Sequence, residues 1–461
     1  PPLERLTAPG ESFDSFVTGP PPIGSMSKRG DLPPSPPGVP MFGNAVQFVR
    51  NPFRFVRESA QSTGDVFRMR FLGTDVYVLA HPDHVETALL DRESFGKLDD
   101  FSVAFGDALL AVEGDRWRRQ RHAMESFFSP TRIREHTDTM VSLAGRRAER
   151  WTDGSTVRID TEMRSLALRN LFEVVLGYAP TAAELDELAE TAHALNLWFE
   201  PSSWVLPAWV PTPARRSFRR GVAEMRDHTR SLLAEGGDEP EDGSLLARLA
   251  ALRDDPDSGF DEAEVLDQVV GMVFAGHETT ALSLTFALHL LGANPTVADR
   301  VVDELDETLD GPPSAADLEE LPALDRVIHE TMRLYPPVHA IPRVTREPVT
   351  LGEHTIPANE TVLLSTWCLH RDPRSYDDPE TFDPTRWAST TPRERGYAFA
   401  PFGGGPRICI GRHLAELELK ATLAEVCRRY RIDATGSLDV TPQMTTQPDG
   451  PVTLRVSDRR R

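Results

Sequence analysis

Hydrophobic positions follow helical spacing along most of the chain. From residue 115 to about 309, apolar side chains recur mainly every three to four residues, as in amphipathic helices. A proline-rich stretch at 201–213 and an acidic turn at 235–244 interrupt this pattern. A further helical pattern runs from about Gly411 to Tyr430. The spacing therefore predicts a mainly α fold.

Shorter apolar runs predict a minor β portion. The sequence DVFRMRFLGTDVYVLA has two β-rich runs around Gly73, which predicts a hairpin, and HPDHVETALL then predicts a helix. After Pro336 the chain changes to short strands and proline turns. Residues 1–40 end in PPSPPGVP, and we expect a disordered or extended leader because clustered prolines cannot form a helix. Residues 41–461 are then expected to form a single domain.

One long predicted helix carries polar residues inside an apolar run. It begins after Asp261, whose spacing to Glu264 fits a capping box, and ends before the sequence GANP. Its middle reads VFAGHETTALSL, so Gly276, Glu278 and Thr279 interrupt the apolar face. A buried glycine costs about 1 kcal/mol relative to alanine, and a buried carboxylate costs several unless it is paired. We expect a compensating function here; the alternative is a tolerated kink with Glu278 in solvent.

The charge balance narrows the choice of partners. The chain has 50 Lys and Arg against 71 Asp and Glu, a net charge of −21. This disfavours nucleic acid and anionic membrane surfaces, which require basic patches. Lysine occurs only as Lys28, Lys97 and Lys420. An acidic, lysine-poor composition fits either adaptation to concentrated salt or the bias of a GC-rich genome, and both explanations stay open.

The cysteines and the hydropathy pattern indicate the cellular compartment. Cys368, Cys409 and Cys427 show no paired spacing, so a reducing cytoplasm is expected and a disulfide framework is not. The N-terminal sequence falls short of the roughly 20 apolar residues that a membrane span requires. We expect a cytoplasmic monomer without a transmembrane anchor.

Cys409 lies in the unusual sequence APFGGGPRICIGR. A cysteine that only fills a core has apolar neighbours, whereas this one follows a glycine-rich turn. Glycines let backbone amides approach a sulfur atom closely, as around a thiolate that ligates haem iron, and Arg407 stands where it can pair with a porphyrin propionate. A phosphate-binding loop is the rival interpretation, but the lysine and Ser/Thr that such a loop places after its last glycine are missing.

The same residues resemble a known family. FGGGPRICIG matches Phe-x-x-Gly-x-Arg-x-Cys-x-Gly, the haem-loop signature of the cytochrome P450 superfamily, at Phe402, Gly405, Arg407, Cys409 and Gly411. AGHETT, ETMR and FDPTRW resemble three further motifs of these haem-thiolate monooxygenases and stand in the family's order. The resemblance implies the triangular P450 fold, mainly α with minor β, with a long central helix over the haem.

The resemblance also implies roles for the polar helix and for a buried network. In AGHETT, Glu278 is expected to relay protons and Thr279 to orient dioxygen, where the helix is loosened by Gly276. ETMR and FDPTRW imply a structural network of Glu330, Arg333 and Arg386, although Trp387 stands where phenylalanine is usual.

The implied cofactor is haem b, iron protoporphyrin IX, with Cys409 as its axial metal ligand. Beyond the loop, the expected contacts to the haem come from Trp117 and Arg121 in DRWRRQR and from Arg343. We expect the enzyme to insert one atom of dioxygen into an apolar substrate, by hydroxylation or epoxidation.

Electrons are expected from a separate protein, because the sequence after the haem helix leaves no room for a flavin or iron–sulfur domain. A ferredoxin is the first expectation and a flavodoxin-like donor the second. The expected docking residues are Arg118, Arg119, Arg412 and Lys420.

The sequence leaves the substrate and two other functions open. By the same resemblance, the pocket is expected to use residues 101–112, Ala275, residues 338–341 and the turn at 445–450. Phe101, Val103, Phe105, Ala275 and Ile341 make this an apolar pocket, and fatty acid, isoprenoid, carotenoid and steroid all remain possible substrates. The first alternative function is a peroxide-driven hydroxylase. The second is a haem-based sensor or binding protein, which would need Cys409 but neither Glu278 nor Thr279.

Overall fold

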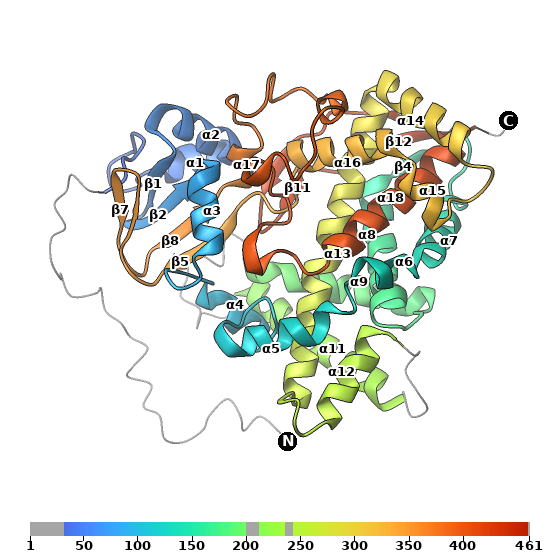
Figure 1. The fold of residues 1–461 in the computed structure, drawn as a ribbon, viewed down its shortest axis with the longest axis horizontal. Coiled ribbons are helices and arrows are strands. Elements are labelled where there is room, and N and C mark those ends of the chain that lie inside the picture. Colours follow the sequence, from blue (N-terminus) through green and yellow to red (C-terminus); the bar gives the residue numbers. More distant parts are fainter. Residues whose placement is uncertain (1–31, 200–211, 236–242, 460–461) are drawn as a thin grey trace.

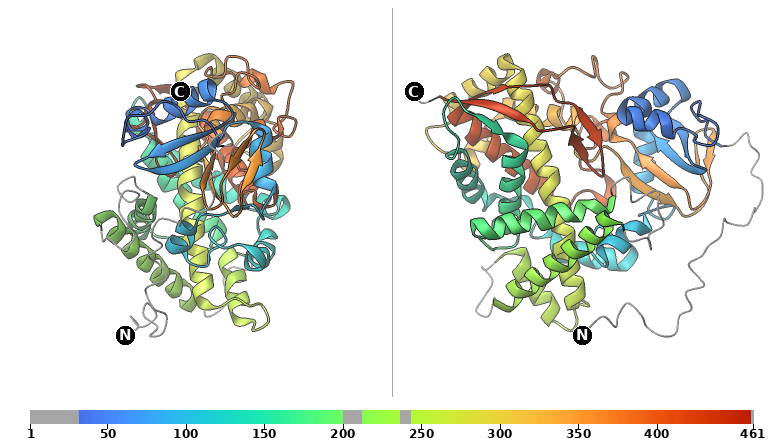
Figure 2. Two further views of the ribbon diagram at one scale, coloured as in Figure 1. Left: turned by 90° about the vertical axis from the view of Figure 1, so that its left-hand side faces the viewer. Right: turned by 180° about the vertical axis from the view of Figure 1, so that it is seen from behind.

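The computed structural model of the protein describes residues 32–199, 212–235 and 243–459. Helix α13 (Glu262–Ala293) runs through the middle of the molecule (Figure 1). Most other helices lie on one side of it, and a five-stranded sheet with short helices lies on the other, as the rear view in Figure 2 also shows. The expected mainly α fold with minor β is confirmed, whereas the predicted helix breaks at 201–213 and 235–244 fall largely outside the described residues.

The other elements follow the order expected from the sequence, including the hairpin around Gly73 and the helix after it. The helices are α1 (Ala45–Arg50), α2 (Pro52–Thr63), α3 (Pro82–Leu90), α4 (Asp99–Phe105), α5 (Gly114–Glu125), α6 (Pro130–Arg134), α7 (Thr137–Ala148), α8 (Ile159–Asn170), α9 (Ala182–Asn196), α11 (Pro213–Glu235), α12 (Leu245–Asp254), α14 (Pro295–Thr308), α15 (Ala315–Glu319), α16 (Pro322–Leu334), α17 (Thr366–Leu369) and α18 (Arg412–Arg429). Shorter helical turns are η3 (Leu171–Val175), η4 (Leu197–Phe199), η5 (Pro384–Trp387), η6 (Gly396–Ala398) and η7 (Gly405–Arg407).

The main sheet has the strand order β1-β2-β8-β5-β3. Only β2 and β8 run parallel; the other neighbours are antiparallel. Two hairpins and a three-stranded sheet, β4-β12-β9, complete the β portion. The strands are β1 (Val66–Phe71), β2 (Thr74–Leu79), β3 (Phe95–Gly96), β4 (Thr156–Arg158), β5 (Ile341–Thr345), β6 (Val349–Leu351), β7 (His354–Ile356), β8 (Thr361–Leu364), β9 (Tyr430–Ala434), β10 (Val440–Pro442), β11 (Thr446–Pro448) and β12 (Thr453–Asp458).

Helix α13 joins two hydrophobic cores. Its first half places Val265, Val269 and Val273 in a cluster with α5, α9 and α12. Its second half places Leu284 and Leu288 in a cluster with α7, α16 and α18. Residues 276–280, which interrupt the apolar pattern in the sequence, lie between these halves. They mark the point where the helix passes from one hydrophobic core to the other.

The start of α13 differs in one respect from the expected capping box. Asp261 accepts a hydrogen bond from the backbone N–H of Glu264 at 2.8 Å, as predicted. The Glu264 carboxylate does not accept the second hydrogen bond of a capping box, from the Asp261 backbone N–H. It accepts hydrogen bonds from Arg119 and Gln120 of α5 instead. Because Glu264 is buried, an arginine and an amide that satisfy both carboxylate oxygens stabilise it better than a single backbone N–H would.

The folded chain also begins earlier than the expected boundary at residue 40. Pro33 and Pro36 are buried, and Arg68 of β1 donates its backbone N–H to Pro34 O at 2.8 Å. Proline lacks a donor but keeps a carbonyl acceptor, so a proline-rich segment can still pair with the edge of a sheet. Residues 1–31 of the expected leader lie outside the described residues.

In the described part of the chain, no single helix has both the length and the apolar composition needed to cross a membrane.

Candidate active site

The loop before α18 brings Cys409 to the centre of the molecule. Its backbone N–H donates to Phe402 O at 3.0 Å, which closes the loop around the sulfur. Gly405 has φ +63°, and a Cβ there would lie 2.8 Å from Leu89 O of α3, so only glycine fits this turn. Burial raises the pKa of the Cys409 thiol, whereas the backbone N–H of Gly411 and the positive charge of Arg121 lower it.

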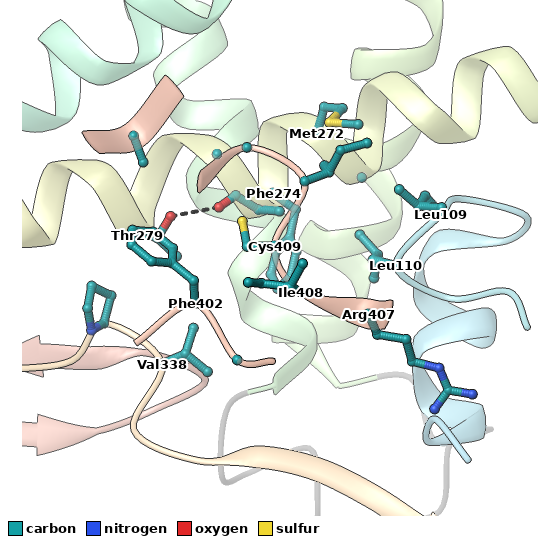
Figure 3. A pocket seen from close by; sticks show the side chains of 18 of the residues that line it. Leu109, Leu110, Met272, Phe274, Thr279, Val338, Phe402, Arg407, Ile408 and Cys409 are labelled. Atoms are coloured by element: carbon teal, nitrogen blue, oxygen red, sulfur yellow. Dashed lines mark hydrogen bonds between the residues drawn. The ribbon is translucent and has the colours of Figure 1, made fainter. Parts of the chain in front are cut away.

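Cys409 faces a cavity of about 410 Å³ with a mostly apolar wall. Figure 3 shows its sulfur directed toward α13, with Thr279 and Phe402 on one side and Leu109 and Leu110 on the other. The expected haem contacts Trp117, Arg121, Arg343, Phe402, Arg407 and Gly411 all border this cavity, as do Gly276 and Thr279. Gly405 does not; its role is the close approach to α3.

Four cationic side chains border one part of the cavity. Arg407 donates to Phe95 O at 2.9 Å and pairs with Glu113, and Arg121 donates to Ile408 O at 2.8 Å. Arg343 is buried, and its Nε has no hydrogen-bond partner among the described residues. Burial and then Arg407 lower the pKa of Arg343 to about 10.

The fourth cation is Lys97, which the sequence analysis missed. Its Nζ donates to Leu109 O at 2.7 Å and to Val112 O at 2.8 Å. Burial first, and then Arg407 and Arg343, lower its pKa to about 7. The sequence did offer one sign of a special role, because Lys97 is one of very few lysines in an acidic chain. Nothing in the local pattern, however, placed it beside the Cys409 loop.

The long helix contributes the opposite wall. Thr279 donates its hydroxyl to Ala275 O at 2.8 Å, and both residues border the cavity. Glu278 is buried but is not part of the cavity wall; its Oε2 accepts a hydrogen bond from Thr445 at 3.2 Å. The sulfur and the threonine hydroxyl thus face one space, and the carboxylate lies just behind it.

Glu330, Arg333 and Arg386 form the network that the resemblance implied. Glu330 and Arg333 are 0 % exposed and pair through two hydrogen bonds of 2.8 Å, and Arg386 Nε adds a third at 2.9 Å. Trp387 takes part as well, because its indole N–H donates to Glu330 Oε2 at 2.9 Å. A phenylalanine at this position would lack that donor. The tryptophan therefore gives the buried carboxylate one more partner.

The expected pocket residues divide into two groups. Phe101, Ala275 and Ile341 border the cavity. Val103 does not, since its side chain is 60 % exposed on the outer face of α4. Phe105 does not border the cavity either. It is buried behind Phe274, with ring centroids 4.5 Å apart, and Phe274 borders the cavity instead. Val103 follows Phe101 by two residues, about 200° around a helix, so the two side chains point to opposite faces of α4, and the sequence pattern did not show which face is inward.

The expected docking residues differ in how accessible their side chains are to a partner protein. Arg118 is 58 % exposed and pairs with Asp115 on its own helix. Arg119 binds the buried Glu264, and Lys420 binds Asp325 at 2.7 Å. Arg412 is half-buried and contacts His413.

The residues around the cavity fit a haem. Arg407 lowers the pKa of both Lys97 and Arg343, so positive charge accumulates here, and the two propionates of a porphyrin would add two negative charges to that of Glu113. The unpartnered Nε of Arg343 is one donor that such a group would satisfy. An apolar wall and a thiol at the centre suit the porphyrin face and its iron.

Comparison with known proteins identifies the family. The model of the cytochrome P450 family matches residues 33–455. Pentalenene oxygenase of Streptomyces avermitilis is 32% identical over 88% of this chain and 93% of its own length. Cyclooctat-9-en-7-ol 5-monooxygenase of Streptomyces melanosporofaciens is 34% identical over 86% of this chain and 89% of its own length. Cyclooctatin synthase of the same organism is 30% identical over 89% of the chain and 92% of its own length. The chain therefore belongs to the cytochrome P450 family and is a haem-iron monooxygenase.

Proposed function

We propose that this enzyme binds haem b on Cys409 and inserts one atom of dioxygen into an apolar cyclic alkene or alkenol, with electrons from a separate ferredoxin. The observation that carries this proposal is the shared cavity, because the Cys409 sulfur and the Thr279 hydroxyl border the same apolar space. Haem with a thiolate ligand supplies the chemistry that cleaves the O–O bond.

The chain's own residues would bind the haem and orient dioxygen. Arg121, Arg343, Arg407 and Lys97 would hold the propionates of a bound haem, and the loop amides would hold the sulfur. Thr279 is placed to orient dioxygen, and Glu278 lies one residue away to supply protons. This retained acid–alcohol pair favours dioxygen over a peroxide-driven reaction, and a sensor would not need it.

The substrate class rests on two supports. The cavity wall is mainly apolar, with Phe101, Leu110, Phe274 and Val338 among its side chains. Two relatives are named for action on pentalenene and on cyclooctat-9-en-7-ol, an alkene and a cyclic alkenol by their names. Of the four classes that the sequence left open, cyclic isoprenoids fit both supports best.

The test combines a spectrum with turnover. The reduced carbon monoxide adduct is expected to show the red-shifted Soret band of a thiolate haem, and Cys409→His is expected to lose it. With a surrogate ferredoxin and reductase, pentalenene or cyclooctat-9-en-7-ol is expected to shift the haem to high spin and to yield an oxygenated product. A Cys409→His protein that kept the band would refute the ligand assignment. Product with peroxide but none with the electron donors would favour the peroxide-driven alternative.

A further inference from the structure

A chain of hydrogen bonds connects Glu278 with a cation near the surface. Thr445 Oγ1 donates to Glu278 Oε2 at 3.2 Å, and Gln447 Nε2 donates to Thr445 Oγ1 at 2.6 Å. Arg164 Nη2 of α8 donates in turn to Gln447 Oε1 at 2.8 Å. Glu278, Thr445 and Gln447 are buried, and Arg164 is half-buried. The chain therefore leads from the cavity wall toward solvent.

All three hydrogen bonds point the same way. Arginine only donates, so the Gln447 carbonyl must be its acceptor, and this fixes the orientation of the Gln447 amide. The amide N–H then donates to Thr445, which leaves the single hydroxyl proton of Thr445 for the Glu278 carboxylate. A cation at the outer end polarises each donor toward that carboxylate.

The strand geometry explains how these side chains reach α13. Thr445 and Gln447 are two residues apart, so they point to the same face of the β11 segment. Thr446 points to the opposite face, where its hydroxyl donates to Pro336 O at 2.6 Å. Its backbone N–H also donates to Pro337 O, at 2.8 Å. One face of the strand is thus tied to the 336–337 segment and the other is presented to Glu278.

We propose that Thr445, Gln447 and Arg164 are positioning residues that orient the Glu278 carboxylate behind the cavity wall. The proposal rests on the proposed function, in which Glu278 supplies protons. This series of hydrogen bonds orients the Glu278 carboxylate and does not itself carry the proton, because the Gln447 amide has no readily ionised proton to pass on. Thr445 borders the cavity and Glu278 does not, so the threonine hydroxyl fixes where the acid stands relative to the reacting space.

The sharpest test is Gln447→Glu. A glutamate keeps the size of the side chain and strengthens the contact with Arg164, but it accepts a hydrogen bond where the amide donated one. The Thr445 hydroxyl then turns toward residue 447 and away from Glu278. We expect kcat for oxygenation of pentalenene with a surrogate ferredoxin to fall about 10-fold, the loss of one hydrogen bond to a charged group, with KM unchanged and a larger solvent isotope effect. A purely structural role for Gln447 predicts wild-type kcat.

Matched variants complete the kinetic test. Thr445→Val is expected to lower kcat to a similar level, and Thr445→Ser, which keeps the hydroxyl, to restore most of it. Thr441→Val and Gln443→Glu make the same chemical changes on the same hairpin outside the chain of hydrogen bonds and are expected to leave kcat unchanged. Equal losses in the controls would overturn the proposal.

A second measurement needs no substrate. In the haem-loaded protein, Thr445→Val is expected to lower the melting temperature by about 2 °C, the effect of roughly 1 kcal/mol in a large domain. In a Glu278→Leu background, the same change is expected to have almost no effect, because its acceptor is gone. Additive melting shifts would refute the link between the two residues. Non-additive shifts in a protein that oxygenates neither probe would leave the positioning intact and refute only the proposed function.

Discussion

At the scale of single residues, Glu418 is a buried carboxyl group in the cavity wall that no part of the proposed chemistry uses. Asn170 Nδ2 donates to its Oε1 at 2.9 Å, whereas the buried Asn170 Oδ1 has no partner among the described residues. Burial raises the pKa of Glu418 to about 8. A protonated Glu418 has an O–H that Asn170 Oδ1 can accept, so the neutral acid and the amide can form a complementary pair with two hydrogen bonds.

This pair predicts a pH dependence of stability. The unfolded carboxyl group ionises near pH 4.5 and the folded one near 8, so the folded state binds an extra proton between these values. Its contribution to stability is complete below pH 4.5 and is lost as the pH rises through 8. Glu418→Gln keeps both hydrogen bonds and does not ionise, so its stability relative to wild type is expected to rise across this window, by at most about 1.4 kcal/mol per pH unit.

Chemical denaturation of the haem-loaded proteins at several pH values between 5 and 8 measures this difference. Glu418→Leu is the control, since it leaves both polar atoms of Asn170 unpaired and is expected to destabilise at every pH. If the curves of wild type and Glu418→Gln ran parallel, Glu418 would not be protonated in the folded protein.

At the scale of elements, the Glu330 network ties α16 to the segment around η5. Arg333 also donates to the carbonyls of His370 and Pro379, each at 2.7 Å, so a single guanidinium joins three stretches of chain. Glu330→Ala would leave Arg333 buried without its counter-charge. We expect a loss of about 3–5 kcal/mol in the free energy of unfolding, seen as low yield, low haem content and early melting.

The chain supplies a matched control for that loss. Glu58 pairs with Arg54 on α2, but both side chains are more than half exposed. Glu58→Ala is expected to cost no more than about 0.5 kcal/mol. Similar losses for the two variants would mean that burial does not govern the strength of the Glu330 network.

The helices, strands and turns also show which features can be predicted from the sequence. Signals that are local in the chain were predictable: the hairpin around Gly73, the Asp261 cap and the glycine-rich turn around Cys409 each depend on a few adjacent residues. Contacts between distant segments were not. The turn at 445–450 was expected at the pocket, but nothing in the sequence gave a reason to pair Thr445 with Glu278, and the diversion of Glu264 to Arg119 required the position of α5. Lys97 and the inward face of α4 were missed for the same reason.

At the scale of the whole molecule, the net charge of −21 opposes an acidic electron donor at long range. We therefore expect docking of such a donor to depend on local basic residues near the Cys409 loop. Arg121 contacts this loop directly, and Arg118 lies one turn before it on α5 with its side chain exposed. Arg412 begins the helix that follows the loop. Arg119 and Lys420, in contrast, are engaged with Glu264 and Asp325 and are less available to a partner.

These opposing charges predict a biphasic salt dependence for reduction by an acidic ferredoxin. Salt first screens the long-range repulsion, so the rate is expected to rise from low ionic strength to about 0.1 M, where the Debye length is about 10 Å. Above this concentration salt weakens the local attraction to Arg118 and Arg412, and the rate is expected to fall. The double variant Arg118→Glu with Arg412→Glu is expected to reduce about 10-fold more slowly and to show only the rising phase, because its local attraction has been reversed. Stopped-flow reduction across a salt series measures both effects, with Arg54→Glu on the distant helix α2 as the control. A double variant that kept the falling phase would place the docking surface elsewhere on the molecule.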